Sequence, residues 1–403
     1  MRHPPFPDGF VWGTATAAHQ VEGGNWNNDW WAWEHDPASP CVEPSADACD
    51  AWHRYPDDLR LLGGLGFGSY RFSVEWSRIE PEDGEWSRVA LDHYRRMCAT
   101  CLEHGLDPVV TFHHFTTPRW LAARGGWSDP ATADRFARFC ETATRAFGDL
   151  MTRACTLNEP NIVATMGYLA GVFPPGAKDP DLRRRANDTF VDAHGKAVEA
   201  IKGVVDVPVG LTLAMADHQA VGGPEAEQRR ARILRNFEDV YLEAVRGDDF
   251  LGVQTYSRVR IGPEGELGPE DGVETTIMGY EFWPEALEAT LRRAWDETAH
   301  VPLLVTENGI ATDDDTRRVE YVARALAGVL RCLDDGVDVR GYTYWSALDN
   351  FEWALGYGPT FGLIAVDRAT QERVVRPSAR WLGECARANA LVEPASLPST
   401  AGR

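Results

Sequence analysis

The sequence predicts an α/β fold, a single (β/α)8 TIM barrel that forms one catalytic domain over residues 1–403. Eight short β-prone runs recur along the chain, with a spacing of roughly fifty residues. Segments with helical periodicity separate these runs, and an alternation of strand and helix indicates a parallel sheet. The chain has 403 residues with 44% hydrophobic composition, enough to bury a large core. Eight such units favour a closed barrel over an open sheet.

The predicted strands are short apolar runs rich in β-branched and aromatic residues. In chain order they cover residues 10–13, 68–72, 108–112, 153–157, 208–213, 250–254, 303–306 and 341–345. The segments between them repeat apolar residues at the spacing of a helix face. The clearest of these predicted helices cover residues 91–104, 131–147, 188–201, 225–245, 285–299 and 319–333. Residues from about 392 to 403 are expected to form a frayed tail.

Charge and cysteine content narrow the class of protein. Asp and Glu outnumber Lys and Arg by 61 to 40, and this acidic balance argues against a nucleic-acid partner. No apolar run reaches signal-peptide character or the roughly 18 residues of a membrane span, so we expect a cytoplasmic protein without membrane contact. The eight cysteines are scattered, and Cys98 and Cys101 lack the second pair that a zinc knuckle needs. We expect reduced thiols and no bound metal.

Polar and aromatic residues follow most of the predicted strands. The βα-loops at the carboxyl ends of barrel strands build the active site of such folds, so these residues should meet at one mouth. The fifth strand gives no such signal. The candidates, in chain order, are Gln20 and Glu22, Arg71, His113 and His114, Asn158 and Glu159, Tyr256, Glu307 and Asn308, and finally Trp345, Glu352 and Trp353.

Two glutamates at this mouth, Glu159 on the fourth strand and Glu307 on the seventh, match the needs of glycosidic-bond cleavage. One carboxyl group protonates the leaving oxygen while the other attacks the anomeric carbon. Arg71 and Tyr256 are expected to keep Glu307 ionised, because a guanidinium and a phenol both favour the charged form. A charged Glu307 should then raise the pKa of Glu159. The hypothesis is that Glu159 is the general acid/base and Glu307 the nucleophile.

The remaining candidates suit a sugar. Amide, imidazole and carboxylate groups pair with vicinal hydroxyls, and indole faces pack on the C–H face of a pyranose. Asn158 and Asn308 are placed to donate to a hydroxyl or to orient a carboxylate. Neighbouring strand residues face opposite sides, so only one of His113 and His114 should lie in the site. The expected substrate contacts are Gln20, His114, Asn158, Trp345, Glu352 and Trp353.

Each candidate also has a simpler explanation. A glutamate at a strand end is often an ion-pair partner, and Pro160 and Gly309 could merely start a helix and form a turn. These explanations would have to hold independently at six strand ends. Two other functions stay open: a metal-dependent hydrolase that uses His53, His113 and His114, and a non-catalytic sugar-binding barrel.

The motifs resemble those of glycoside hydrolase family 1, the β-glucosidase and β-galactosidase family, from Phe10 to about Glu384. The resemblance implies that Glu159 is the acid/base, that Glu307 is the nucleophile, and that Gln20 and His114 bind sugar hydroxyls. It also carries over Arg71, and it implies a glycone-binding segment at the eighth strand. The matching segments are residues 10–23, 70–79, 111–118, 156–160, 306–309 and 344–353.

Some features set this chain apart within the resemblance. Gln254-Thr255-Tyr256 stands where the family commonly has Asn-Tyr-Tyr, and the chain is shorter than many members. Loops on the aglycone side are therefore expected to be trimmed around residues 262–272, which would open the acceptor site. Glu159 is not the glutamine of the thioglucosidase branch. Glu352 would repel a phosphate near O6, which favours neutral sugars.

The sequence therefore predicts a retaining exo-β-glycosidase, foremost a β-glucosidase, that acts on small β-glycosides with terminal glucosyl, galactosyl or fucosyl groups. No cofactor is required, because proton transfer and covalent catalysis suffice. A transglycosylase or a natural-product deglycosylase with the same residues is the alternative. A monomer and a homodimer suit the sequence equally, and the aglycone is left open.

Overall fold

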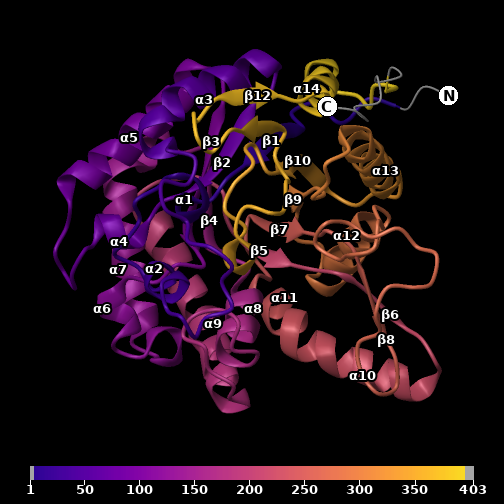
Figure 1. Cartoon of the computed structure of the whole chain (residues 1–403), viewed down its shortest axis with the longest axis horizontal. Coiled ribbons are helices and arrows are strands. Elements are labelled where there is room, and N and C mark those ends of the chain that lie inside the picture. The colour runs from indigo at the N-terminus through magenta and orange to yellow at the C-terminus, as the bar shows by residue number, and fades with distance from the viewer. Residues whose placement is uncertain (1–3, 395–403) are drawn as a thin grey trace.

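The structure is a computed structural model that describes residues 4–394. Eight parallel strands close into a barrel in the order β1-β10-β9-β7-β5-β4-β3-β2. This confirms the predicted (β/α)8 fold, and Figure 1 shows the strands at the centre with helices around them. Each predicted strand overlaps one barrel strand. Their bounds are β1 Val11–Ala15, β2 Ser69–Ser73, β3 Asp107–His114, β4 Arg153–Asn158, β5 Val209–Ala214, β7 Phe250–Gln254, β9 Leu303–Asn308 and β10 Val339–Trp345.

Helices such as α5, α7 and α13 cover the outside of the barrel and bury an apolar stripe against it. The predicted helix 225–245 is interrupted by a π-helical turn at Arg235–Asp239, which separates α10 from α11. The long helices are α3 Ala51–Leu65, α5 Arg88–Glu103, α7 Thr132–Phe147, α9 Pro180–Lys202, α10 Pro224–Leu234, α12 Ala286–Glu297, α13 Asp315–Asp334 and α14 Pro377–Ala388. The short helices are α1 Ala18–Val21, α2 Asp29–Glu34, α4 Trp76–Ile79, α6 Arg119–Ala122, α8 Pro160–Ile162 and α11 Val240–Ala244.

An apolar layer fills one level of the barrel interior. Its five side chains come from five different barrel strands and form a cluster separate from the main core. Such layers of inward-facing side chains make a barrel of this kind a packed core and not a pore. Polar groups at the mouth therefore stand above an apolar interior. The layer consists of Val11, Val109, Cys155, Phe250 and Leu304.

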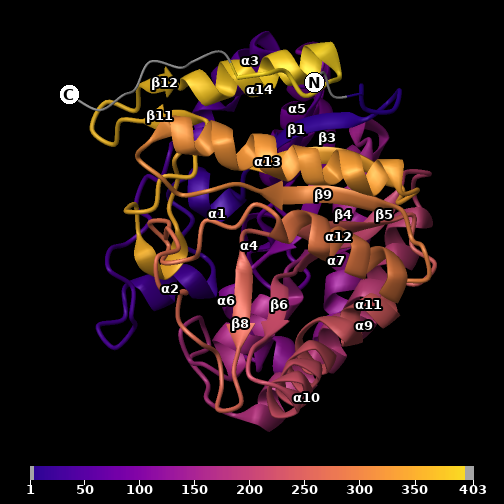
Figure 2. The same ribbon diagram turned by 90° about the vertical axis from the view of Figure 1, so that its right-hand side faces the viewer.

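A two-stranded ribbon lies outside the barrel and was not predicted. Its strands, β6 Asp217–Ala220 and β8 Arg258–Ile261, follow the barrel strands β5 and β7 and pair in parallel. Figures 1 and 2 both show the ribbon and α10 outside the ring of barrel strands. A small antiparallel pair, β11 Ile364–Val366 with β12 Arg373–Val375, precedes α14. The ribbon widens the molecule beside the β5 and β7 loops.

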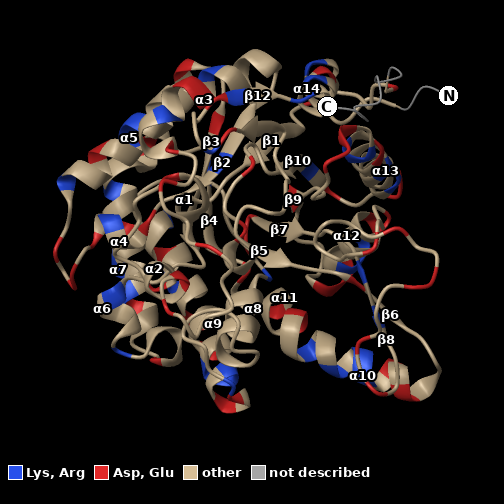
Figure 3. Ribbon diagram, in the orientation of Figure 1, with Lys and Arg blue, Asp and Glu red and all other residues tan. Residues whose placement is uncertain are grey.

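Charged residues concentrate on the outer helices and loops, while the barrel strands are mostly uncharged (Figure 3). Within residues 4–394, no helix has the length and apolarity that a membrane crossing requires. The predicted frayed tail lies, for residues 395–403, outside the described part of the chain.

Candidate active site

Glu307 lies at the mouth of the barrel, near the end of β9. The residue is 4% exposed, and three donors bind its carboxylate. Arg71 Nη1 donates to Oε1 at 2.7 Å and Gln254 Nε2 donates to the same oxygen at 3.0 Å. The Tyr256 hydroxyl donates to Oε2 at 2.6 Å. Burial is the largest influence and leaves the pKa of Glu307 above its ordinary value, although Arg71, Tyr256 and Gln254 each lower it. These donors stabilise the ionised carboxylate in a buried site.

Asn158, the last residue of β4, links the strands around this carboxylate. Its Oδ1 accepts from Arg71 Nη2, from Gln254 Nε2 at 2.9 Å and from Thr212 Oγ1 at 3.0 Å. Arg71 lies on β2, Thr212 on β5 and Gln254 on β7, so one amide oxygen ties four strands together. A network with this many bonds fixes side-chain positions more tightly than a single pair does. Asn158 thus orients the groups that hold Glu307.

Glu159 follows directly after β4 and has a different environment. Its backbone is left-handed, with φ of 43°, and its N–H donates to the Thr212 carbonyl at 2.8 Å. Among residues 4–394, no side chain or backbone group hydrogen-bonds its carboxyl group. Burial and then the charge of Glu307 raise the pKa of Glu159 well above its ordinary value, and the more distant Arg71 offsets this only in part. Both influences favour the protonated form of the Glu159 carboxyl group.

Gln20 and Glu352 lie next to each other at the mouth, in the segments that follow β1 and β10. Gln20 Nε2 donates to the Phe351 carbonyl at 2.8 Å and approaches Glu352 Oε2 at 3.4 Å. Burial and the charge of Glu307 raise the pKa of Glu352 to about 8, which the contact with Gln20 lowers in part. The predicted glycone residues from the first and eighth strands therefore lie side by side.

The two vicinal histidines separate as strand alternation predicts. Asn158 Nδ2 donates to His114 Nε2 at 3.2 Å, which places the ring proton of His114 on Nδ1. His113 points away from the mouth, into an aromatic cluster with Trp127 and Phe190. Burial among these rings lowers the pKa of His113 to about 3. Only His114 belongs to the site.

The indoles of Trp345 and Trp353 both lie near the His114 ring and nearly parallel to it. The ring planes lie within 19° and 15° of the imidazole plane, at centroid distances of 5.8 and 6.1 Å. The backbone of Trp353 is left-handed, with φ of 53°, which costs on the order of 1–3 kcal/mol for a bulky residue. Packing against Trp30 and a parallel His19 ring holds it in this conformation.

Two candidates lie elsewhere. Asn308 does not face the mouth, because Glu307 does and neighbouring strand residues alternate. Its Nδ2 donates to the Thr255 carbonyl at 2.7 Å and its Oδ1 accepts from the Tyr342 hydroxyl at 2.8 Å. The expectation that Asn308 orients a carboxylate or binds a hydroxyl is therefore wrong. The residue instead joins β9 to its neighbours.

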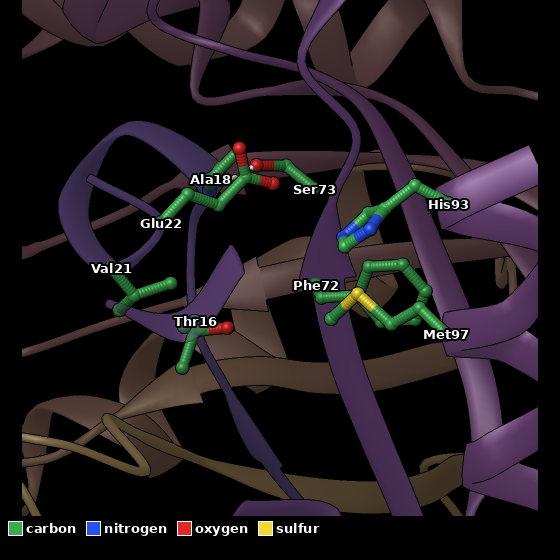
Figure 4. A pocket seen from close by; sticks show the side chains of 9 residues that line it. Thr16, Ala18, Val21, Glu22, Phe72, Ser73, His93 and Met97 are labelled. Atoms are coloured by element: carbon green, nitrogen blue, oxygen red, sulfur yellow. Dashed lines mark hydrogen bonds between the residues drawn. The ribbon is translucent and has the colours of Figure 1, made fainter. Parts of the chain in front are cut away.

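Glu22 also lies away from the mouth, where it contacts Arg78 and Tyr94. Arg78 Nε donates to its Oε2 at 2.8 Å, and the Tyr94 hydroxyl donates to its Oε1 at 2.8 Å. Figure 4 shows Glu22 beside Ser73 and His93 around a small buried cavity. Neither proposed catalytic glutamate lines this cavity. Glu22 is part of the support of the loop and not of the site.

The histidines of a metal-dependent alternative do not gather. His53 is an exposed residue of α3 that pairs with Asp50 at 2.7 Å, and His113 is buried among aromatic rings behind β3. Across the described residues, no group of three or more His, Cys, Asp and Glu side chains could hold a metal ion. This arrangement gives the metal-dependent alternative no ligand set.

Several buried polar atoms at the mouth have no partner within residues 4–394. They are Gln20 Oε1, His114 Nδ1 and Gln254 Oε1. A buried polar atom without a hydrogen bond is costly, so such atoms are normally paired. Two are acceptors and one is a donor, and hydroxyl groups can satisfy both. The site therefore fits a ligand with several hydroxyls.

Thr212 and Gln254 are the two site residues that the sequence did not single out. Thr212 belongs to the fifth strand, which carries no charged or aromatic residue at its end. The sequence identifies Gln254 only as a difference from the Asn that is common in the family at this position. Its longer side chain reaches both Asn158 and Glu307. The signal for both residues was their position beside Asn158 and Glu307 in adjacent strands.

Two buried carboxyl groups at one barrel mouth, only one of them surrounded by donors, are the site of a glycoside hydrolase. The chain belongs to glycosyl hydrolase family 1, whose sequence profile matches residues 2–256 and 254–391. It is 32% identical to β-glucosidase A of Thermotoga maritima, over 97% of this chain and all of that protein. It is 33% identical to a bifunctional β-D-glucosidase/β-D-fucosidase of Bifidobacterium breve, over 93% of this chain and 97% of that protein. The crystal structure of β-glycosidase BGL167 is 48% identical and superposes with a TM-score of 0.91, over 98% and 100%.

Proposed function

We propose that the protein is a retaining exo-β-glycosidase that cleaves terminal β-D-glucosyl groups, with Glu307 as nucleophile and Glu159 as general acid/base. The observation that carries this proposal is the difference in hydrogen-bond donors between the two carboxyl groups. Within residues 4–394, three donors bind the Glu307 carboxylate, whereas no donor binds the Glu159 carboxyl group, whose pKa is raised well above the ordinary value. One is prepared to attack as an anion and the other to give up a proton.

In the first step, Glu307 attacks C1 of the sugar and the bond from C1 to the glycosidic oxygen breaks. Glu159 transfers its proton to that oxygen, so the leaving group departs as a neutral alcohol. Arg71 and Gln254 both bind Oε1, which fixes the carboxylate plane during the attack. The product of this step is a glycosyl ester on Glu307.

In the second step, water attacks C1 and Glu159 accepts its proton. Formation of the ester removes the charge of Glu307, and that charge is one of the two main causes of the raised pKa of Glu159. The pKa of Glu159 therefore falls in the intermediate, and the same group becomes a base. Two inversions at C1 give net retention.

Gln20, His114 and Glu352 are proposed to bind the hydroxyls of the terminal sugar. Gln20 Oε1 and His114 Nδ1 have no hydrogen-bond partner in the described part of the chain, and Glu352 lies next to Gln20. Trp353 offers an indole face in the same region. A phosphorylated sugar is disfavoured, because its phosphate would bring negative charge into the buried region of Glu352, where the charge of Glu307 already acts. Neutral hexoses are therefore the proposed glycone.

β-Glucosides are proposed over β-galactosides and β-fucosides because the similar proteins above carry β-glucosidase names, one of them together with β-fucosidase. A cytoplasmic location is proposed with it, since all eight cysteines are free thiols.

A panel of 4-nitrophenyl β-glycosides tests this proposal. The β-glucoside should give the highest kcat/KM, followed by the β-fucoside or β-galactoside, and proton NMR should detect the β-anomer of glucose first. A higher kcat/KM for another glycone would overturn the glucoside preference. An α-anomer as first product, or no turnover of any β-glycoside, would overturn the mechanism.

A further inference from the structure

His19 is buried directly before Gln20 in α1 and contacts the segment that follows β10. Its imidazole centroid lies 5.8 Å from that of the Trp353 indole, with the two ring planes only 9° apart. It also meets the Phe351 ring edge-on at 5.9 Å. The next residue, Gln20, exchanges two hydrogen bonds with the backbone of Phe351, at 2.8 and 3.2 Å. His19 and Gln20 together therefore join the first barrel loop to the proposed sugar-binding segment.

Two asparagine amides fix the orientation of the His19 ring. Asn28 Oδ1 accepts from the Trp31 N–H at 2.8 Å, which directs its Nδ2 donor toward His19 Nδ1 at 3.1 Å. Asn25 Nδ2 donates to Glu75 Oε2 at 2.7 Å and lies 3.3 Å from the same ring nitrogen. Because two N–H donors face Nδ1, the ring proton is on Nε2.

The carboxyl group of Glu34, in α2, accepts the hydrogen bond from His19 Nε2 at 3.2 Å. The Ser45 hydroxyl donates to the other Glu34 oxygen at 2.6 Å. Neither the His19 nor the Glu34 side chain has exposed surface. A buried polar group is costly without its partners, so the bonds at both ring nitrogens hold the imidazole in one arrangement.

The conformation of Trp353 depends on the rings around it. Its φ of 53° is left-handed, a conformation that a bulky residue adopts only when its surroundings impose it. Trp30 and Phe115 pack on the indole at 4.6 and 4.8 Å, and those contacts are apolar. The His19 ring differs from them, because hydrogen bonds at both of its nitrogens set its plane. The parallel indole takes its orientation from that plane.

We propose that His19, oriented by Glu34, is a positioning residue of the proposed sugar site. It keeps the Trp353 indole and the preceding Glu352 at fixed places relative to Gln20, and so sets the affinity for a hexose whatever its leaving group. The inference rests on the proposed function. Within residues 4–394, neither His19 nor Glu34 hydrogen-bonds either proposed catalytic carboxyl group, so the effect reaches turnover through sugar binding.

His19→Ala tests the inference with D-glucose as a competitive inhibitor, because glucose occupies the sugar site without a leaving group. Removal of the ring should raise the Ki of glucose about tenfold, the equivalent of one or two lost hydrogen bonds to the sugar. kcat/KM should fall by a similar factor for 4-nitrophenyl β-glucoside and cellobiose alike. The limbs of the pH profile should stay in place, because both catalytic carboxyl groups keep their surroundings. A wild-type Ki in this variant would overturn the inference.

Two variants at Glu34 separate the hydrogen bond from the bulk of the side chain. Glu34→Gln retains an oxygen acceptor for His19 Nε2 and should leave the glucose Ki within about twofold of the wild-type value. Glu34→Ala removes the acceptor and should raise the Ki about threefold to tenfold. Equal Ki values in the two variants would overturn the part assigned to Glu34.

His93→Ala is the matched control. His93 is 6% exposed and stacks on Trp52 at 3.6 Å and 9°, the same kind of contact beside the small cavity of Glu22 (Figure 4). Its loss should lower the melting temperature as His19→Ala does but leave the glucose Ki unchanged. An equal rise in Ki in both variants would show a general loss of stability and overturn the inference. Absence of turnover of every β-glycoside by the wild-type protein would instead refute the proposed function.

Discussion

The two sides of the mouth are built in different ways. Around Glu307, every contact comes from a barrel strand or the residues just beyond it, and Arg71, Asn158 and Gln254 form one continuous network. On the side of the leaving group, the Glu159 carboxyl group makes no hydrogen bond within residues 4–394. A loop hairpin, residues 274–282, reaches the mouth through the Ile277 N–H, which donates to the Ala311 carbonyl at 3.3 Å. The barrel thus fixes the chemistry at C1, and its loops decide what departs from it.

The largest effect should follow from Glu307→Gly. Loss of the nucleophile should reduce kcat by a factor on the order of 10⁴ or more for every β-glucoside, whatever its leaving group. Azide should fit the space left by the side chain and restore turnover, with an α-glycosyl azide as product. Wild-type activity in this variant would remove Glu307 from the mechanism.

Glu159→Ala should produce a loss that depends on the leaving group. The general acid contributes about 10²- to 10⁴-fold, and this applies to poor leaving groups such as sugars and alkyl alcohols. A 2,4-dinitrophenyl glucoside needs no proton and should lose far less in its first step. Here azide should give a β-glycosyl azide, because it attacks the intermediate from the face that water uses. The same loss for all leaving groups would contradict the assigned role.

Tyr256→Phe should act on the Glu307 side through the pH profile. The phenol lowers the pKa of Glu307, so its removal raises that pKa and leaves less carboxylate ionised at acid pH. The acid limb of kcat/KM should move to higher pH, and kcat/KM at the optimum should fall about tenfold to a hundredfold, the value of a hydrogen bond to a charge. An acid limb that stays in place would show that Tyr256 does not control Glu307.

Gln254→Ala should give the smallest effect and sharpen the comparison most. Its amide binds both Glu307 and Asn158, so a loss of about tenfold is expected for aryl glucosides and cellobiose alike. Glu159→Ala is instead expected to separate an activated aryl glucoside from cellobiose. Steady-state kinetics of both variants on both substrates would test this contrast, and a substrate-dependent loss in Gln254→Ala would contradict it.

The sequence predicted the barrel because most barrel strands contain an apolar run that is buried on both faces. The ribbon was not predicted, because neither of its strands contains an apolar run. The sequence of β6 is Asp-His-Gln-Ala and that of β8 is Arg-Val-Arg-Ile. Asn308 was misplaced because proximity to a strand end does not specify which face a residue occupies. The alternation that separated His113 from His114 also excludes Asn308 once Glu307 is known to face the mouth. Thr212 needed the structure, since a threonine beside an asparagine has no signature of its own.

The most direct test of the divided roles is to trap the intermediate. A 2-deoxy-2-fluoro-β-glucoside with a 2,4-dinitrophenyl leaving group slows both steps but allows the first to proceed, and peptide mass spectrometry then locates the sugar. The account predicts one fluoroglucosyl group per chain, on the peptide that contains Glu307, and none on Glu307→Gly. A label on Glu159, or turnover with no covalent adduct at any time, would contradict it.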